Sequence, residues 1–229
     1  MKWLIVTGDD FGISPGINRG IIESHLGGIL TSTSLMVDRP ACEEAAALAA
    51  RCPKLSLGLH LELDGVDPGD VPGEIERQHT RFVDLVGSAP THVDTHHDVH
   101  RDPQVLSHLL PWGRRLGVPV RDHSGVRYFS KFYGQWGGES HLEQISVEGF
   151  LRLLDTEIGE GMTELNCHPG FPEPGFPSSY AAEREVEART LCDPRLRQEI
   201  LQRGVRLIGF RDLRALAAAG AGPGAGDIA

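Results

Sequence analysis

The stretch WLIVTGDDFGISPGINRGIIESHLGG, residues 3–28, decides the fold. Residues 3–7 are a short, apolar and partly β-branched run, which predicts a buried strand. After the turn GDDFG, Ser14 and Pro15 have the residue types of a helix N-cap and a first helical position, and the helix is expected to end at Gly27. A strand, a turn and a helix in this order form the repeating unit of α/β proteins.

The same alternation continues along the chain. Further strands are expected at residues 29–37, 55–63, 91–96, 118–123, 163–168 and 205–210. Helices are expected at residues 42–52, 74–86, 103–116, 147–158 and 194–203, with a short one from Asp212. Sustained alternation implies right-handed crossovers and a parallel sheet, either open or closed as a barrel. We expect one domain, residues 1–216, and a disordered Gly/Ala-rich tail, residues 217–229.

Composition limits the class of function. The chain has 229 residues and a formal net charge of −10, and no run is rich in Lys or Arg. This argues against nucleic-acid binding as the main task and, more weakly, against binding to anionic membranes. No stretch approaches the ~20 apolar residues of a membrane span, and the N-terminus lacks the features of a signal peptide. Four widely spaced cysteines suit reduced thiols. We therefore expect a cytoplasmic protein and leave a homodimer open.

Polar residues gather where the expected strands end. They are Asp9 and Asp10, then His60, then the run THVDTHHDVH at residues 91–100, and His168. The carboxyl ends of parallel strands share one edge of a sheet, where α/β enzymes build their sites, so these groups are expected to meet. If residues 91–100 begin as a strand, Asp94, His96 and Asp98 point to one side and His97 to the other.

One aspartate and two histidines from three strands form a familiar metal-ligand set that leaves coordination positions open for water and substrate. We predict Asp10, His60 and His96 as the ligands of one divalent metal ion. Imidazole suits zinc, cobalt, nickel or iron, and the carboxylate keeps manganese open. The alternatives are that the Asp pair only builds a turn and that His60 is a core residue with satisfied hydrogen bonds.

Acid–base groups are also present beside the predicted ligands. Asp9, next to Asp10, is a candidate general base for an attacking water. His168, in NCHPGF, is a candidate general acid for the leaving group, although it can equally be a loop histidine held by prolines. A Cys167–His168 dyad is a weaker alternative, because buried cysteines are more often hydrophobic core residues.

Two other features have ordinary explanations. The charged run AAEREVEAR at residues 181–189 is expected to be a solvated helix face. Trp112, Phe132, Tyr133 and Trp136 have aromatic faces that suit sugar rings, although core packing is the commoner fate of such residues. Of these, Trp136 in its glycine-containing segment is the better candidate for lining a site.

The segments LIVTGDDFGISPGINRGI, GLHLEL, THVDTHHDVH, ELNCHPGF and VRLIGFRDL, in this order, closely resemble motifs of the YdjC-like (ChbG/HpnK) carbohydrate deacetylases. The resemblance runs from about residue 3 to residue 214. It implies an irregular TIM-like (β/α) barrel, a divalent metal ion (zinc first, then magnesium, manganese or cobalt) and removal of an N-acetyl group from an amino sugar or its conjugates.

On the family pattern, Asp10, His60 and His96 are metal ligands, Asp9 is the base and His168 the acid, and Arg121 is expected to contact the carbohydrate substrate. Two departures stand out. Asp98 replaces a family histidine, and the segment 64–90 is short. These departures keep open a different acyl substrate, such as an O-acetyl ester. A non-catalytic metal- or sugar-binding protein is the third alternative, although Asp9 beside Asp10 argues against it.

Overall fold

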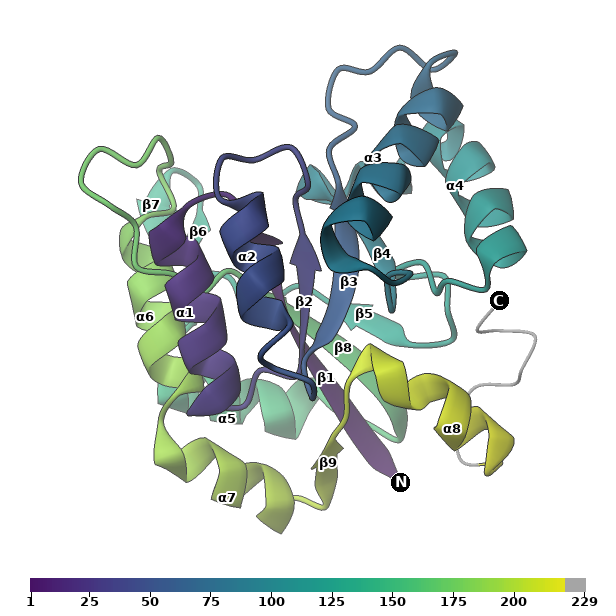
Figure 1. Ribbon diagram of the computed structural model, residues 1–229. Helices are drawn as coiled ribbons and strands as arrows, with labels where there is room; N and C mark the ends of the chain where they lie inside the picture. The colour runs from purple at the N-terminus through teal and green to yellow at the C-terminus, as the bar shows by residue number, and fades with distance from the viewer. Residues whose placement is uncertain (221–229) are drawn as a thin grey trace.

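The computed structural model of the protein describes residues 1–220. A parallel sheet curls into a half-barrel and helices surround it (Figure 1), which confirms the expected α/β class. The tail predicted for residues 217–229 lies mostly outside the described residues, and Ala217 and Ala218 belong to the last helix. No helix within residues 1–220 is both long enough and apolar enough to cross a bilayer.

The strands of the main sheet are β1 (Lys2–Phe11), β2 (Ser32–Leu35), β3 (Ser56–Leu61), β4 (Val93–Thr95), β5 (Arg127–Phe129), β8 (Gly161–Cys167) and β9 (Val205–Leu207). They lie in the order β4-β3-β2-β1-β8-β5, with β9 paired to β1, and every pair is parallel. A small antiparallel hairpin consists of β6 (Gln135–Trp136) and β7 (Glu139–Ser140).

The helices are α1 (Pro15–Leu26), α2 (Cys42–Ala49), α3 (Val71–Val86), α4 (Pro103–Leu116), α5 (Val147–Glu157), α6 (Ala182–Leu191), α7 (Pro194–Gln202) and α8 (Leu213–Ala218). The start of α1 confirms the expected cap, because the Ser14 side chain accepts a hydrogen bond from the Ile17 amide and Pro15 follows. Capping of this kind satisfies amide groups that have no partner within the helix.

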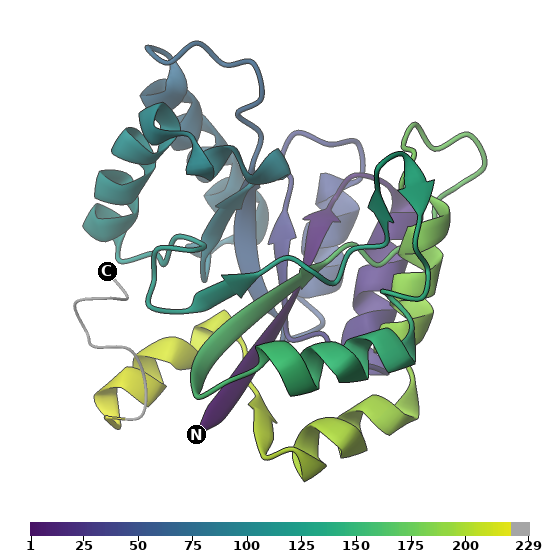
Figure 2. The ribbon, with the colours of Figure 1, turned by 180° about the vertical axis from the view of Figure 1, so that it is seen from behind.

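The centre of the sheet is strand β1, whose residues Leu4, Ile5 and Val6 are fully buried. Strands buried on both faces read as continuous apolar runs, which explains why this segment shows no alternation of polar and apolar residues. Because β1 is central, its carboxyl end lies in the middle of the edge that carries the polar residues (Figures 1 and 2).

Two predictions of secondary structure near the site are wrong. Strand β4 ends at Thr95, and residues His96–Arg101 form a 3-10 turn in which His97 and Asp98 have left-handed backbone angles, with φ of 53° and 54°. The expected alternation of side chains through residue 98 therefore fails. The segment 118–123 forms no strand and contributes one isolated bridge, between Val93 and Val120.

The prediction for the charged run at 181–189 is also wrong. Helix α6 packs against α1, and Glu183, Arg184 and Glu187 are buried in that arrangement. Charged residues are rarely buried unless they are paired. Their burial therefore points to partners within the protein, and these partners lie at the carboxyl edge of the sheet.

Candidate active site

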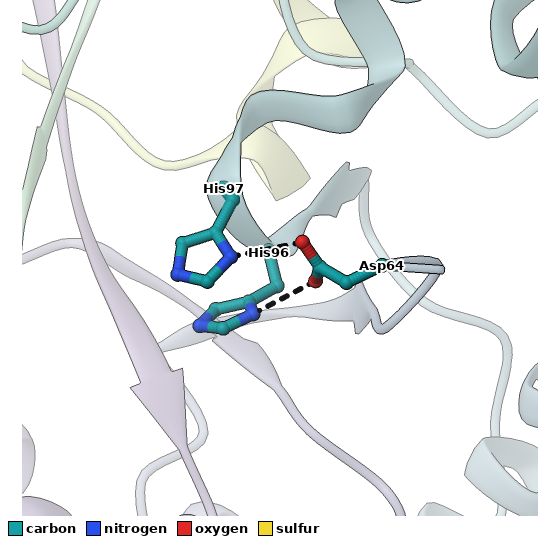
Figure 3. A group of neighbouring side chains, drawn as sticks. All are labelled: Asp64, His96 and His97. Carbon is teal, nitrogen blue, oxygen red and sulfur yellow. Dashed lines mark hydrogen bonds and ion pairs between the residues drawn. The ribbon is translucent and has the colours of Figure 1, made fainter. Parts of the chain in front are cut away.

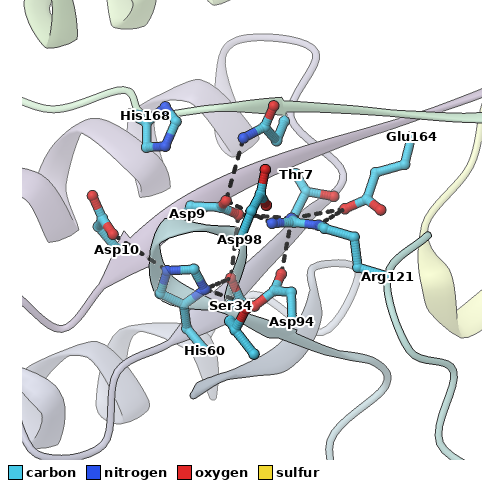
Figure 4. Close-up of polar contacts among 12 residues, drawn as sticks. Thr7, Asp9, Asp10, Ser34, His60, Asp94, Asp98, Arg121, Glu164 and His168 are labelled. Carbon is cyan, nitrogen blue, oxygen red and sulfur yellow. Dashed lines mark hydrogen bonds and ion pairs between the residues drawn. The ribbon is translucent and has the colours of Figure 1, made fainter. Parts of the chain in front are cut away.

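Asp9 and Asp10 both face the carboxyl edge of the sheet because β1 is irregular at its end. The register between β1 and β2 shifts between Gly8 and Phe11, and Asp10 has a left-handed φ of 70°. In a regular strand two neighbouring side chains point to opposite faces. The irregularity instead lets Asp9 and Asp10 contribute to one polar cluster (Figure 4).

Asp9 is buried and held by Arg121 through two parallel contacts. The two Nη groups of Arg121 donate to the two carboxylate oxygens at 2.7 and 2.8 Å. Ser34 Oγ donates to Asp9 Oδ1 at 3.3 Å, and Asn166 Nδ2 lies 3.5 Å from Oδ2. A bidentate arginine contact fixes both the position and the plane of a carboxylate.

The guanidinium of Arg121 is fully buried among three carboxylates. Besides Asp9, it contacts Asp94 at 2.8 Å and Glu164 at 2.8 and 3.0 Å. Burial raises the pKa of Glu164 to about 7, even though Arg121 opposes this change. Arg121 has no exposed surface and contacts acidic groups of the protein itself in this cluster. This geometry favours a role in holding Asp9 and not the expected contact with substrate.

His60 lies between Asp94 and Asp10. Its Nδ1 contacts the Asp94 carboxylate at 2.7 Å, and its Nε2 faces Asp10 Oδ1 at 3.4 Å. Burial alone would lower the pKa of His60, but Asp94 and Asp10 raise it well above its ordinary value. Burial would likewise raise the pKa of Asp10, yet the ion pair with Arg184 and the contact with His60 hold that pKa well below its usual range.

His96 approaches this pair without completing the predicted set. The rings of His60 and His96 lie edge to face, with centroids 5.8 Å apart. The Nδ1 atoms of His96 and His97 contact the two oxygens of Asp64 at 3.1 and 2.9 Å (Figure 3). Asp64 thereby holds one ring nitrogen of His96 and leaves Nε2 as the nitrogen available to a ligand.

Within residues 1–220, two groups of three acidic and histidine side chains bring their ligand atoms close enough together to hold a metal ion. In each group the three ligand atoms lie within 4.8 Å of one another; one group is Asp64, His96 and His97, and the other is Asp9, His60 and Asp94. The predicted set of Asp10, His60 and His96 is not one of the two. The contact between Asp10 and His60 nevertheless fits a metal ion, because tetrahedral zinc with bonds of ~2.0–2.1 Å separates its ligand atoms by roughly 3.4 Å. Asp94 on the far nitrogen of His60 is the kind of partner that orients a metal-binding imidazole.

His168 follows β8 and lies on the far side of Asp10 from His60 (Figure 4). Its Nδ1 is buried and has no hydrogen-bond partner, while its backbone amide donates to Glu187. Burial lowers the pKa of His168, although Asp10 and Asp9 oppose this change. The neighbouring Cys167 thiol is fully buried and donates to the Thr7 carbonyl at 3.2 Å, which suits a core residue.

Several residues of the cluster were not identified from the sequence. Arg184 pairs with Asp10, and Glu187 accepts from the His168 amide and the Tyr180 hydroxyl. Both lie on α6, within the charged run that the sequence predicts to be a solvated helix face. Glu164 carried a detectable signal, because a glutamate stands inside the segment 163–168 that the sequence predicts as a strand.

The chain is similar to proteins of one family over most of its length. The profile of the YdjC-like protein family matches residues 3–72 and 64–202. A carbohydrate deacetylase of Geobacillus stearothermophilus is 34% identical over 249 aligned positions, which cover 92% of this chain and 98% of the relative. A chitooligosaccharide deacetylase of Enterobacter sp. (strain 638) is 34% identical and covers 93% and 99%. An alignment of 249 positions exceeds the 229 residues of this chain, so the relatives contain residues that it lacks.

Solved structures share the fold. A putative cellobiose-phosphate cleavage protein from Enterococcus faecalis V583 superposes with a TM-score of 0.81 at 27% identity, covering 93% of this chain and 98% of the other. A family 4 carbohydrate esterase from Streptomyces lividans has a TM-score of 0.59 at 12% identity, covering 90% and 91%, and supports the TIM-like character of the half-barrel alone. With the profile match and the identities above, the chain belongs to the YdjC-like protein family.

Proposed function

We propose that the protein is a metal-dependent hydrolase that removes the acetyl group from an N-acetylated amino sugar, an oligosaccharide of such sugars or a glycoconjugate. The observation that supports the proposal is the pair Asp10–His60. Asp10 Oδ1 and His60 Nε2, the two atoms that would bind the metal, lie 3.4 Å apart, next to the Asp9 carboxylate that Arg121 holds. Relatives that match nearly the whole chain are named carbohydrate and chitooligosaccharide deacetylases.

Asp10, His60 and His96 would hold the metal, with zinc as our first expectation. A divalent ion, when bound, supplies a Lewis acid for the acetyl carbonyl and for the attacking water. Asp94 holds His60 so that Nε2 faces Asp10, and Asp64 holds His96 in the same manner. These contacts keep both rings oriented for a ligand on the nitrogen that is left free.

Asp9 is the proposed base. Each carboxylate oxygen has two lone-pair sites, and Arg121 takes one on each. The longer contacts, from Ser34 Oγ at 3.3 Å and Asn166 Nδ2 at 3.5 Å, are the ones that an attacking water would displace to give its proton to Asp9. Arg121 prevents the carboxylate from rotating and provides a fixed positive charge next to it. A base held in one orientation lowers the entropic cost of reaching the reactive geometry.

His168 is the proposed acid, and it would donate a proton to the amine nitrogen as the C–N bond breaks. The support for this role is its place beside Asp10 and its ring nitrogen without a partner. A general acid must reach the leaving group within hydrogen-bond distance. The rings of Tyr133 and Tyr180 contact the His168 imidazole edge to face, with centroid distances of 5.9 and 5.7 Å, and restrict how the imidazole can turn.

The test is acetate release from N-acetylglucosamine, its β-1,4 oligomers, their 6-phosphates and matched O-acetyl esters. Each substrate is assayed with chelated protein and again after zinc, cobalt, manganese or magnesium is restored. We expect release from an N-acetyl substrate that stops on chelation and returns with a metal. Release from the esters alone would favour the alternative acyl substrate. Binding without any turnover would favour a binding protein.

A variant pair separates the metal site from general damage. Asp10→Asn keeps a residue that tolerates a left-handed backbone but removes the charge, so bound metal and acetate release should both be lost. Asp67→Asn makes the same change in an exposed loop and should keep both. Full activity of the Asp10 variant without bound metal would refute the mechanism.

A further inference from the structure

Two exposed aromatic side chains lie three residues apart in one segment of the chain, and the first of them contacts the site. Among the large hydrophobic side chains of residues 1–220 that are well exposed, the aromatic ones are Tyr133 and Trp136, which are 37% and 49% exposed. Both belong to the segment that leads into and forms strand β6. An exposed aromatic residue loses the benefit of burial, and neighbouring ones are typical of a surface that binds a ligand.

Each of these rings is stacked on a second ring that holds it in place. Tyr133 stacks on Tyr180 with centroids 4.4 Å apart and planes inclined by 3°. Trp136 stacks on His141 at 3.6 Å and 4°. One face of each ring is thus covered by protein, and the exposed fraction of each side chain faces water. Rings held in this way lose little conformational freedom when a ligand binds.

The backbone beneath the rings is also fixed. The Gly134 amide donates to the Tyr180 hydroxyl at 2.8 Å, and the Tyr180 hydroxyl donates to Glu187. Gln135 makes two hydrogen bonds with Ser179: its amide nitrogen donates to the Ser179 carbonyl, and its amide oxygen accepts from the Ser179 hydroxyl. The aromatic segment is therefore attached to the loop before α6, and it also offers polar groups beside the rings.

The position of the segment connects it to the proposed chemistry. The Tyr133 ring lies 5.9 Å from the ring of His168, the proposed acid. Figures 1 and 2 place the β6–β7 hairpin beside α6, at the end of the sheet toward which β1 and β2 run. Three residues of extended chain span no more than about 11 Å, so the backbone of Trp136 lies within that distance of Tyr133.

We propose that Tyr133 and Trp136 form a stacking subsite for sugar rings next to the one that carries the reacting acetamide. A pyranose presents C–H groups on its faces and hydroxyl groups around its edge, which matches an aromatic face flanked by amide and hydroxyl groups. Tyr133 contacts the ring nearest His168, and Trp136 contacts the next ring outward. This inference rests on the proposed function, and it assigns the selection of substrate length to these two residues.

Steady-state kinetics tests the subsite. KM and kcat are measured for N-acetylglucosamine and for its β-1,4 trimer with the zinc-loaded protein and with Trp136→Ala, Tyr133→Ala and Trp136→Phe. We expect the ratio of the trimer KM to the monomer KM to rise about tenfold in Trp136→Ala, the size of one aromatic contact, and to be largely restored by phenylalanine. Leu201→Ala removes an exposed side chain on α7 and should leave the ratio unchanged.

A binding measurement separates this inference from the proposed function. Calorimetry with the acetylated trimer is carried out on chelated protein, which the proposed mechanism expects to be inactive, so that the trimer is not consumed and a dissociation constant can be determined. Weaker binding in both alanine variants supports the subsite even if no acetate appears in any assay, a result that would count against the hydrolase alone. Equal trimer binding in wild type, Trp136→Ala and Tyr133→Ala, or no trimer binding in any of them, overturns the subsite.

Discussion

Glu164 makes the stability of the protein depend on pH in a way that one substitution can isolate. Burial raises the pKa of this carboxyl from 4.5 to about 7. A pKa difference of one unit corresponds to 1.36 kcal/mol. The free energy of unfolding is therefore about 3 kcal/mol larger with Glu164 protonated than with Glu164 ionised. This contribution is fully present below the unfolded pKa, near 4.5, and is lost as the pH rises through the folded value, near 7.

The substitution Glu164→Gln keeps an oxygen that accepts from Arg121 Nε and Nη2 but removes the titration. The free energy of unfolding of the variant, minus that of wild type, should therefore increase by about 3 kcal/mol between pH 4.5 and pH 8. Urea unfolding of chelated protein across this range measures the difference. Glu148→Gln, on the exposed surface of α5, should change stability by no more than about 0.5 kcal/mol. A difference that does not vary with pH would refute the reasoning.

Other perturbations address the proposed metal site and the packing around it. Asp94→Asn weakens the contact that orients His60 and should reduce zinc affinity by about 10- to 100-fold, as measured by competition with a coloured chelator; unchanged affinity would show that the contact is dispensable. Asp64→Asn should also weaken zinc binding, by about tenfold or less because this carboxylate is partly exposed, and an effect larger than that of Asp94 would contradict the ranking. Gly16→Ala places a Cβ 1.9 Å from the Phe171 carbonyl oxygen and should cost about 1–3 kcal/mol in urea unfolding, whereas a neutral result would mean that the loop moves freely.

Local signals account for the part of the fold that could be predicted. Helix α4 has the predicted bounds, Pro103–Leu116, because Asp102 caps its start and Gly117 adopts the left-handed conformation at its end. Such signals act within a few residues and are visible in the sequence. The end of β4 at Thr95 was not visible, because it depends on left-handed backbone angles in a run of histidine and aspartate residues.

The site was predictable to the extent that strand ends determine it. Asp9, Asp10 and His60 follow or end buried strands, and parallel pairing brings such ends together. Arg184 and Glu187 could not be identified, because the direction a polar helix faces is set by what packs against it. Their charged neighbours in sequence gave the pattern of a solvated helix, and tertiary contacts overrode it.

Residues with a left-handed backbone conformation at the carboxyl edge of the sheet limit which substitutions this protein can accept. In the part of the chain that the structure describes, the non-glycine residues with positive φ are Asp10, His97, Asp98 and Asp122. Aspartate and asparagine accept this conformation more readily than most residues. At Asp10, most substitutions would therefore harm folding and chemistry together, whereas asparagine spares the backbone. Even asparagine removes the charge that pairs with the buried guanidinium of Arg184, so a lineage that loses Asp10 also loses stability unless Arg184 changes with it.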